Sequence, residues 1–373
     1  MRRTITWLFF LILFTTFAGS RAYAGETVLL LEEPYGHFGG MNPTGHAAVY
    51  LSEVCANTPT QLRHCEPGET GVVLSRYNSI EGYDWLAMPL IPYLYAVDDP
   101  SQIPDTADAR LVARLRDRYR REHFLDLAPD DPKKEVPEGN WTQLVGAAYD
   151  RKIYGLAIET RREQDDSFIA AFNDKANVSH FNLFFNNCAN FAEKIMNFYY
   201  PHSIHRNFIA DGGLMTPKQA ARSLTKYSKR HPEFEFTTFV IPQVPGTIHR
   251  SFRIDGIAEA LLTSKRYVLP LAYLHPVFTA TLAAAYFGGG GRFHFDPHAV
   301  VFDPLVDLIP GIPAEHKTAV VNSPNSSEPN PSDMGPAPVP LPDSAPVASL
   351  FTSGSDDAAE RPGKAIMPIH KEE

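Results

Sequence analysis

Cys188 has the most distinctive chemical setting in this chain. It follows an aromatic run and two asparagines, in the sequence FFNNCANFAEK over 184–194. The pattern predicts a strand over 180–185 and an amphipathic helix that begins at the cysteine. A thiol at a helix N-terminus meets unpaired backbone N–H groups and the positive end of the helix dipole, which favour the nucleophilic thiolate. Cys188 is therefore a candidate nucleophile; the alternative is a buried structural cysteine, since free cysteine is often buried.

The first 24 residues have the pattern of a secretory signal peptide. Arg2 and Arg3 form a charged start, residues 7–14 are apolar, and Ala22 and Ala24 frame an A-x-A cleavage site. We therefore expect an exported protein, periplasmic or in the cell envelope.

The remaining two cysteines, Cys55 and Cys65, are close together in a polar segment. In an oxidising compartment such a pair is expected to form a disulfide. That leaves Cys188 as a free thiol, which in an exported chain indicates a reactive group. The alternative is that Cys188 pairs with one of the other two.

A cysteine nucleophile needs a base, usually a histidine that the fold brings close. His46 is the best candidate, because it follows a Gly- and Pro-containing loop and begins a short apolar strand, HAAVYL over 46–51. His37 lies in a glycine-rich loop, and His180 lies in the strand expected before Cys188. Both are rival bases.

The order of these two motifs resembles the circularly permuted papain-like superfamily. A Gly-His pair at a strand start comes first, and Asn-Cys-x-x-Phe on a helix comes much later. This superfamily includes lecithin–retinol acyltransferase-like enzymes, PPPDE peptidases and permuted NlpC-type hydrolases. The periplasmic domain of Lnb-type lipoprotein N-acyltransferases is similar at the same two places.

The resemblance covers only about 42–51 and 180–198. It implies His46 as general base, Cys188 as nucleophile, and Asn187 as a residue that orients the cysteine or the oxyanion. No clear third polar residue follows the histidine strand, and Ser75 is the nearest candidate. We therefore expect a dyad.

Composition excludes several other classes of function. The chain has 373 residues, 44% of them hydrophobic, and a net charge of −9. It lacks the basic face that nucleic-acid binding requires, a Cys/His spacing typical of zinc sites, and a glycine-rich nucleotide loop before a helix. We expect no metal, no cofactor and no nucleic-acid partner.

The segment 267–287 bears on location, because its 21 residues include no Asp, Glu, Lys or Arg. As one helix it would span roughly 30 Å, the thickness of a bilayer core. Pro270 and Pro276 interrupt it. A membrane-spanning anchor, an interfacial hairpin and a buried core helix are the three alternatives, and we expect membrane association.

The pattern of the chain predicts a domain order and a fold class. The domains are a signal peptide (1–24), a catalytic domain (25–262), an apolar segment (263–292), and a linker with a disordered Pro/Ser-rich tail (293–373). The fold class is α+β, with a permuted papain-like core in which an antiparallel sheet packs on the cysteine-bearing helix, plus helical additions. The expected strands are 27–31, 46–51, 71–77, 153–159, 180–185 and 234–242. The expected helices are 105–127, 141–149, 163–174, one that begins at Cys188, and one that begins at Pro217 after the Thr216 cap. The segment 34–45 is expected to be a loop, and the aromatic segment 82–99 is expected to cover a site.

Together these observations predict an exported thiol enzyme. His46 would take the proton of Cys188, or the two would rest as a thiolate–imidazolium pair, and the sulfur would carry an acyl group as a thioester. The expected substrates are lipid or lipoprotein acyl or amide groups. The alternatives are a cell-wall peptide hydrolase and a non-catalytic envelope scaffold, since a fold alone does not imply catalysis.

Overall fold

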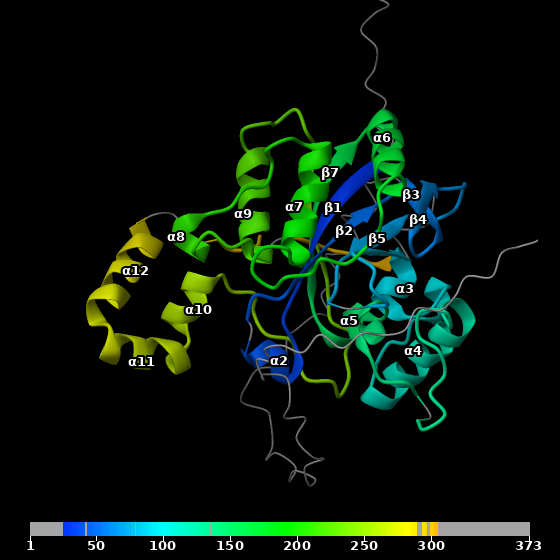
Figure 1. Ribbon diagram of the computed structural model, residues 1–373, viewed down its shortest axis with the longest axis horizontal. Helices are drawn as coiled ribbons and strands as arrows, with labels where there is room; N and C mark the ends of the chain where they lie inside the picture. The colour runs from blue at the N-terminus through cyan, green and yellow to red at the C-terminus, as the bar shows by residue number, and fades with distance from the viewer. Residues whose placement is uncertain are drawn as a thin grey trace, which may run out of the picture. The chain divides into compact units, whose positions relative to one another are not determined.

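A seven-stranded sheet in the order β6-β5-β2-β1-β7-β8-β9 forms the centre of the protein (Figure 1). The computed structural model describes residues 25–41, 43–78, 80–134, 136–288, 293–296 and 299–304. Neighbouring strands are antiparallel, except that β8 and β9 are parallel. The strands are β1 (Gly25–Glu32), β2 (His46–Leu51), β5 (Val72–Ser75), β6 (Leu86–Pro89), β7 (Ile153–Thr160), β8 (Phe236–Ile241) and β9 (Val300–Val301).

Helices cover both faces of the sheet. Side chains alternate between the two faces along a strand, so each central strand contributes to two cores. Val28 and Leu30 of β1 belong to a core with α3, α4 and α5, whereas Leu29 and Leu31 belong to a core with α6, α7 and α9. The mixed α+β class with a mostly antiparallel sheet is thus confirmed. The helices are α2 (Gly36–Met41), α3 (Leu90–Tyr95), α4 (Ala109–His123), α5 (Ala147–Asp150), α6 (Arg162–Asn173), α7 (Cys188–Tyr199), α8 (Phe208–Asp211), α9 (Pro217–Ser228), α10 (Ile257–Thr263), α11 (Lys265–Leu274) and α12 (Pro276–Gly288), with 3-10 turns at Pro100–Gln102 and Asn140–Gln143.

The two paired cysteines staple a small hairpin beside the main sheet. Strands β3 (Val54–Thr58) and β4 (Gln61–His64) form this hairpin, and Cys55 is bonded to Cys65. Cys188 is free. Both expectations about the cysteines are therefore confirmed.

Several expected elements are wrong or incomplete. Residues 180–185 are not a strand, because Asn182 and Asn186 exchange backbone hydrogen bonds of 3.2 and 3.0 Å and fold the segment into a tight turn. The expected loop over 34–45 contains α2, and the expected helix over 141–149 is interrupted before Gly146, whose φ is +75°. The segment 82–99 includes β6 and α3, whose side chains are mostly core.

The apolar segment 267–287 forms two short helices and not one long one. Helix α11 ends at Leu274, and α12 begins at Pro276, so the chain turns back at His275. Among the described residues, no helix combines the length and the apolar character needed to cross a membrane. Most side chains of this pair are exposed, which contradicts the core-helix alternative. The expected signal peptide and the tail from 305 onward lie outside the described residues.

Removal of the disulfide should weaken the fold measurably. The bond closes a loop with a sequence separation of 10, and chain entropy then predicts a loss of about 2–3 kcal/mol in the free energy of unfolding. Urea unfolding of Cys55→Ala/Cys65→Ala against the wild type measures this difference. An unchanged midpoint would mean that the hairpin contributes nothing to global stability.

Candidate active site

Asn187 places Cys188 at the first position of α7. Its Oδ1 accepts a hydrogen bond of 2.9 Å from the backbone N–H of Asn190, which is the N-cap bond of the helix. Its Nδ2 donates to the carbonyls of Leu183 at 3.0 Å and Met215 at 3.1 Å. Both amide hydrogens are thereby used. Asn187 thus holds the thiol in place and has no spare hydrogen for an oxyanion.

The Cys188 sulfur lies against the start of β2. The backbone N–H groups of Ala47, Ala189 and Cys188 itself lie near the sulfur and lower its pKa. These contacts favour thiolate, but burial is the larger effect and raises the pKa of the Cys188 thiol. Desolvation therefore outweighs the helix end, which favours the alternative in which the thiol gives up its proton during the reaction over a resting thiolate–imidazolium pair.

His46 begins β2 and is the residue next to Ala47. Its ring stacks on Tyr77, with ring centroids 4.5 Å apart and planes within 5°. Burial lowers the pKa of His46 to about 4, although the charge of Glu32 acts in the opposite direction. Its Nε2 is buried and forms no hydrogen bond with a described residue. The imidazole is therefore neutral near pH 7, and a Cys188–His46 hydrogen bond through Nε2 is not formed at rest.

The rival bases lie in different settings. His37 is on α2 and His180 precedes the turn at 182–186, and both side chains are exposed. Ser75 is buried on β5, where its register partner is Ala48. His46 is on the strand that packs on the cysteine helix, but its ring stacks on Tyr77, which belongs to the core on the opposite face of the sheet from α7.

A buried ion pair, which the sequence analysis missed, lies beside His46. Glu32 is the register partner of His46 across β1 and β2, and it is fully buried. Arg151 contacts the Glu32 carboxylate at 2.8 Å, and Tyr93 donates a hydrogen bond to it. The Arg151 guanidinium also lies 4.8 Å from the centre of the Tyr35 ring. The available signal was an acidic residue at the end of an apolar strand.

Arg76 fixes the chain that leads into the nucleophile. It donates to Asn186 Oδ1 at 2.6 Å, pairs with Asp84 at 2.5 Å, and stacks over Phe191 with 4.7 Å to the ring centre. Arg76 follows β5 directly, so these contacts connect the sheet to the base of the 182–186 turn. The turn itself is therefore held firmly at its base.

The tip of this turn is apolar and exposed. Asn182 Oδ1 accepts from the backbone N–H groups of Phe184 and Phe185 at 3.0 and 3.1 Å, which closes the tip. Leu183, Phe184 and Phe185 are each more than half exposed. This exposed apolar tip therefore lies within five residues of the thiol in the sequence. The pockets of about 360–520 Å³ found among the described residues are lined by other side chains.

Comparison with known proteins gave no relative. The chain matches no protein-family model, no curated protein and no solved structure.

The raised thiol pKa predicts slow alkylation at neutral pH. The rate of iodoacetamide reaction at Cys188 should climb with pH to a midpoint above the ordinary thiol value of 9.0, because only the thiolate reacts. Mass spectrometry of the Cys188 peptide at a series of pH values measures the rate. Fast alkylation that stays constant between about pH 5 and 8 would instead indicate a resting thiolate–imidazolium pair.

Loss of one partner of the buried pair should be costly. Glu32→Gln leaves Arg151 buried without its counter-charge, which should lower the free energy of unfolding by about 3–5 kcal/mol. Urea unfolding measures this loss, with Glu69→Gln in the partly exposed Arg63–Glu69 pair as the control, where about 1 kcal/mol or less is expected.

A double substitution tests the same prediction if the single variant fails to fold. Glu32→Gln/Arg151→Met removes both charges and should recover much of the lost stability. A Glu32→Gln variant as stable as Glu69→Gln would show that the pair does not constrain this end of the sheet.

Proposed function

We propose that this protein is a Cys–His thiol enzyme that transfers acyl groups through a thioester on Cys188. The observation that carries the proposal is the contact of the Cys188 sulfur with the Ala47 N–H, next to a histidine whose buried Nε2 has no protein partner among the described residues. Buried polar atoms normally have partners. An unsatisfied ring nitrogen on the residue next to Ala47 supports a role as general base, which requires the ring to turn toward the sulfur when substrate binds.

The reaction begins from neutral groups. As the Cys188 sulfur attacks the acyl carbonyl carbon, its proton passes to His46 Nε2, and the C=O pair moves to oxygen. The tetrahedral intermediate collapses, the bond to the leaving amine or alcohol breaks, and His46 returns the proton to that group. A water, amine or alcohol then attacks the thioester with His46 again as base, and Cys188 leaves and regains its proton.

Backbone N–H groups at the start of α7 can stabilise the oxyanion. The N–H groups of Cys188 and Ala189 point to the sulfur at rest, so they also lie near a carbonyl oxygen on an attacked carbon. Asn187 acts by positioning, since its cap bond fixes the first turn of α7. This divides the roles: Cys188 as nucleophile, His46 as base, and Asn187 as the residue that holds the helix start.

The antiparallel sheet on a cysteine-bearing helix, with the histidine strand earlier in the chain, supports a permuted papain-like arrangement. The apolar tip at Leu183, Phe184 and Phe185 supports a lipid or lipoprotein acyl group as donor, because an acyl chain gains contact with exposed apolar side chains near the thiol. Cys188 is half-buried, so an acyl group can approach it from the side that remains exposed.

Matched variants test the dyad. A fluorescent acyl probe should label wild-type protein and fail to label Cys188→Ala. With an ester substrate, Cys188→Ser and His46→Ala should each reduce kcat/KM by at least about 10³, and the double variant should be no worse, because residues acting as one unit are not additive. Asn187→Ala should lower kcat, whereas Thr216→Ala, which removes the equivalent cap of α9, should not.

Two outcomes would contradict the proposal. Equal labelling of wild type and Cys188→Ala would place the acyl group elsewhere. Full activity in a folded His46→Ala variant would remove His46 as the base. A complete absence of labelling by both lipid and peptide probes would favour the non-catalytic scaffold.

A further inference from the structure

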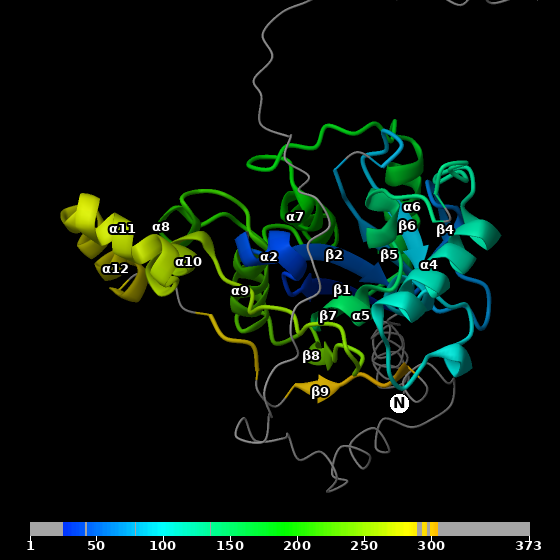
Figure 2. The ribbon, with the colours of Figure 1, turned by 90° about the horizontal axis from the view of Figure 1, so that it is seen from below.

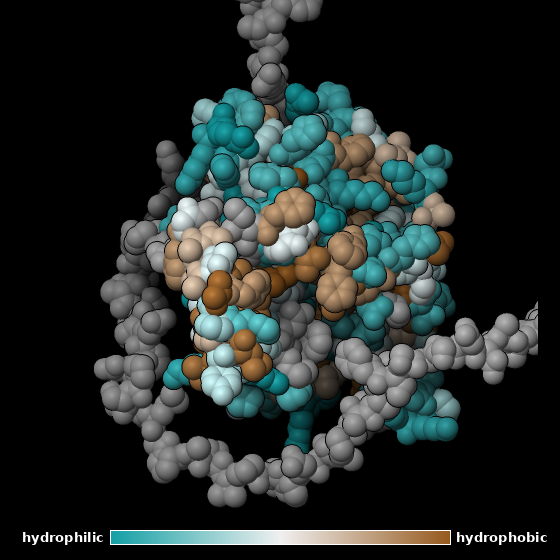
Figure 3. Space-filling model, turned by 60° about the vertical axis from the view of Figure 1, so that its left-hand side comes forward, coloured by the Kyte–Doolittle hydropathy of each residue, from teal (hydrophilic) through white to brown (hydrophobic). Residues whose placement is uncertain are grey.

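The α11–α12 pair carries the largest run of exposed apolar side chains among the described residues. Its exposed members have exposed fractions between 55% and 87%. Figure 3 shows apolar side chains gathered on the face that carries these helices. In Figures 1 and 2 the pair stands at the edge of the protein, away from the sheet. We call this surface the apolar hairpin, and it consists of Leu269, Tyr273, Leu274, Val277, Phe278 and Phe287.

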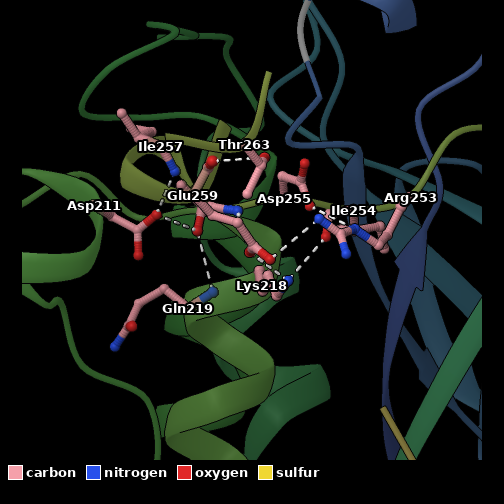
Figure 4. A network of polar contacts seen from close by, with 11 residues as sticks. Asp211, Lys218, Gln219, Arg253, Ile254, Asp255, Ile257, Glu259 and Thr263 are labelled. Atoms are coloured by element: carbon pink, nitrogen blue, oxygen red, sulfur yellow. Dashed lines mark hydrogen bonds and ion pairs between the residues drawn. The ribbon is translucent and has the colours of Figure 1, made fainter. Parts of the chain in front are cut away.

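The base of the apolar hairpin is fixed by a buried polar network (Figure 4). Lys218 of α9 pairs with Glu259 of α10 at 2.5 Å and donates to the carbonyl of Ile254 at 3.2 Å. Asp211 of α8 accepts from the backbone N–H of Ile257, at the start of α10, at 2.9 Å. Tyr286 of α12 hydrogen-bonds to Glu259 and is buried. One side of the pair is thus locked to the protein, while the rest projects into solvent.

This hairpin is continuous with the thiol site. The Asn187 side chain bonds both the 182–186 turn, through Leu183, and the segment before α9, through Met215. That segment begins at α8, which contacts α12 and carries Phe208 with 79% of its surface exposed. The start of α7 therefore lies between two exposed apolar elements, the turn tip and the α8–α12 side.

We propose that the apolar hairpin docks on the surface of a lipid bilayer. It has no charged residue over 267–287, so it can enter the acyl region without burying a charge. Lys265 and Arg266 stand at its start, where they complement anionic headgroups. Tyr267 and Tyr273 have the amphipathic rings that favour the membrane interface. Two helices of 10 and 13 residues lie in the interface and do not cross it.

The charges and tyrosines of the hairpin favour a bilayer over a protein partner, because Lys265 and Arg266 complement headgroups and two tyrosine rings suit the interface. On α12 Tyr286 is buried and one further side of the helix is half-buried, so the helix projects one broad face into solvent. The proposal is independent of the thiol chemistry, because it rests on exposure, charge and the locked base.

Vesicle binding by the full chain tests this docking. The probes are vesicles of phosphatidylcholine alone and of an equal mixture with phosphatidylglycerol, and co-flotation is the readout. Leu274→Glu/Val277→Glu should weaken binding about tenfold or more, and Lys265→Gln/Arg266→Gln should remove the preference for the anionic vesicles. Leu125→Glu, at an exposed apolar residue beyond α4, should bind like the wild type. All variants share the same first 24 residues, so differences report on the hairpin.

Further arms decide between this and other outcomes. Cys188→Ala should bind vesicles like the wild type, which separates docking from acyl transfer. Circular dichroism should show that the glutamate variants, made at exposed positions, remain folded. Unchanged flotation of Leu274→Glu/Val277→Glu, or no flotation of the wild type, would overturn the proposal. The proposal would also be overturned if light scattering showed that the wild type is a dimer and that Leu274→Glu/Val277→Glu is a monomer, because the surface would then join two copies of this chain.

Discussion

The buried Glu32–Arg151 ion pair is the constraint that fixes the end of the sheet where β1 finishes and β2 begins, which is the end that carries His46. Two opposite charges can be kept from water only if their geometry and their remaining hydrogen bonds are held closely. Glu32 ends β1, Arg151 precedes β7, and Tyr93 of α3 donates a hydrogen bond to the carboxylate. These elements must meet at one place. The β1–β2 register then puts His46 opposite Glu32, so the same pair fixes where the candidate base lies.

The electrostatics of this arrangement favour neutral partners over a resting ion pair. Burial raises the pKa of Cys188 and lowers that of His46 to about 4. A thiol of this kind is protected from unwanted oxidation and alkylation in an oxidising environment, because reactivity follows thiolate content. In the proposed reaction, attack on a carbonyl requires proton transfer to His46 as the substrate arrives. Burial is the main cause of the lowered pKa of His46, and Arg151 adds to it against the opposing charge of Glu32, so the imidazole stays uncharged near pH 7.

Local patterns in the sequence predicted most of what positions the site, and long-range contacts account for what they missed. The His46 strand, the Cys188 helix and the Thr216 cap follow from periodicity and capping residues, which are short-range signals. The strand predicted over 180–185 is wrong, because the prediction rested on apolar content, whereas Asn182 and Asn186 close a turn. The Glu32–Arg151 pair joins residues more than a hundred positions apart, and spacing along the chain carries no sign of it.

The central claim, that Cys188 carries an acyl group as a thioester, is tested most directly by intact-mass spectrometry. The protein is mixed with an activated acyl ester and quenched in acid, and the modified peptide is then mapped. We predict a mass increase equal to the acyl group on the Cys188 peptide, which neutral hydroxylamine removes and which His46→Ala forms far more slowly. An acyl group found on another residue, or an adduct that forms equally fast without His46, would contradict the account.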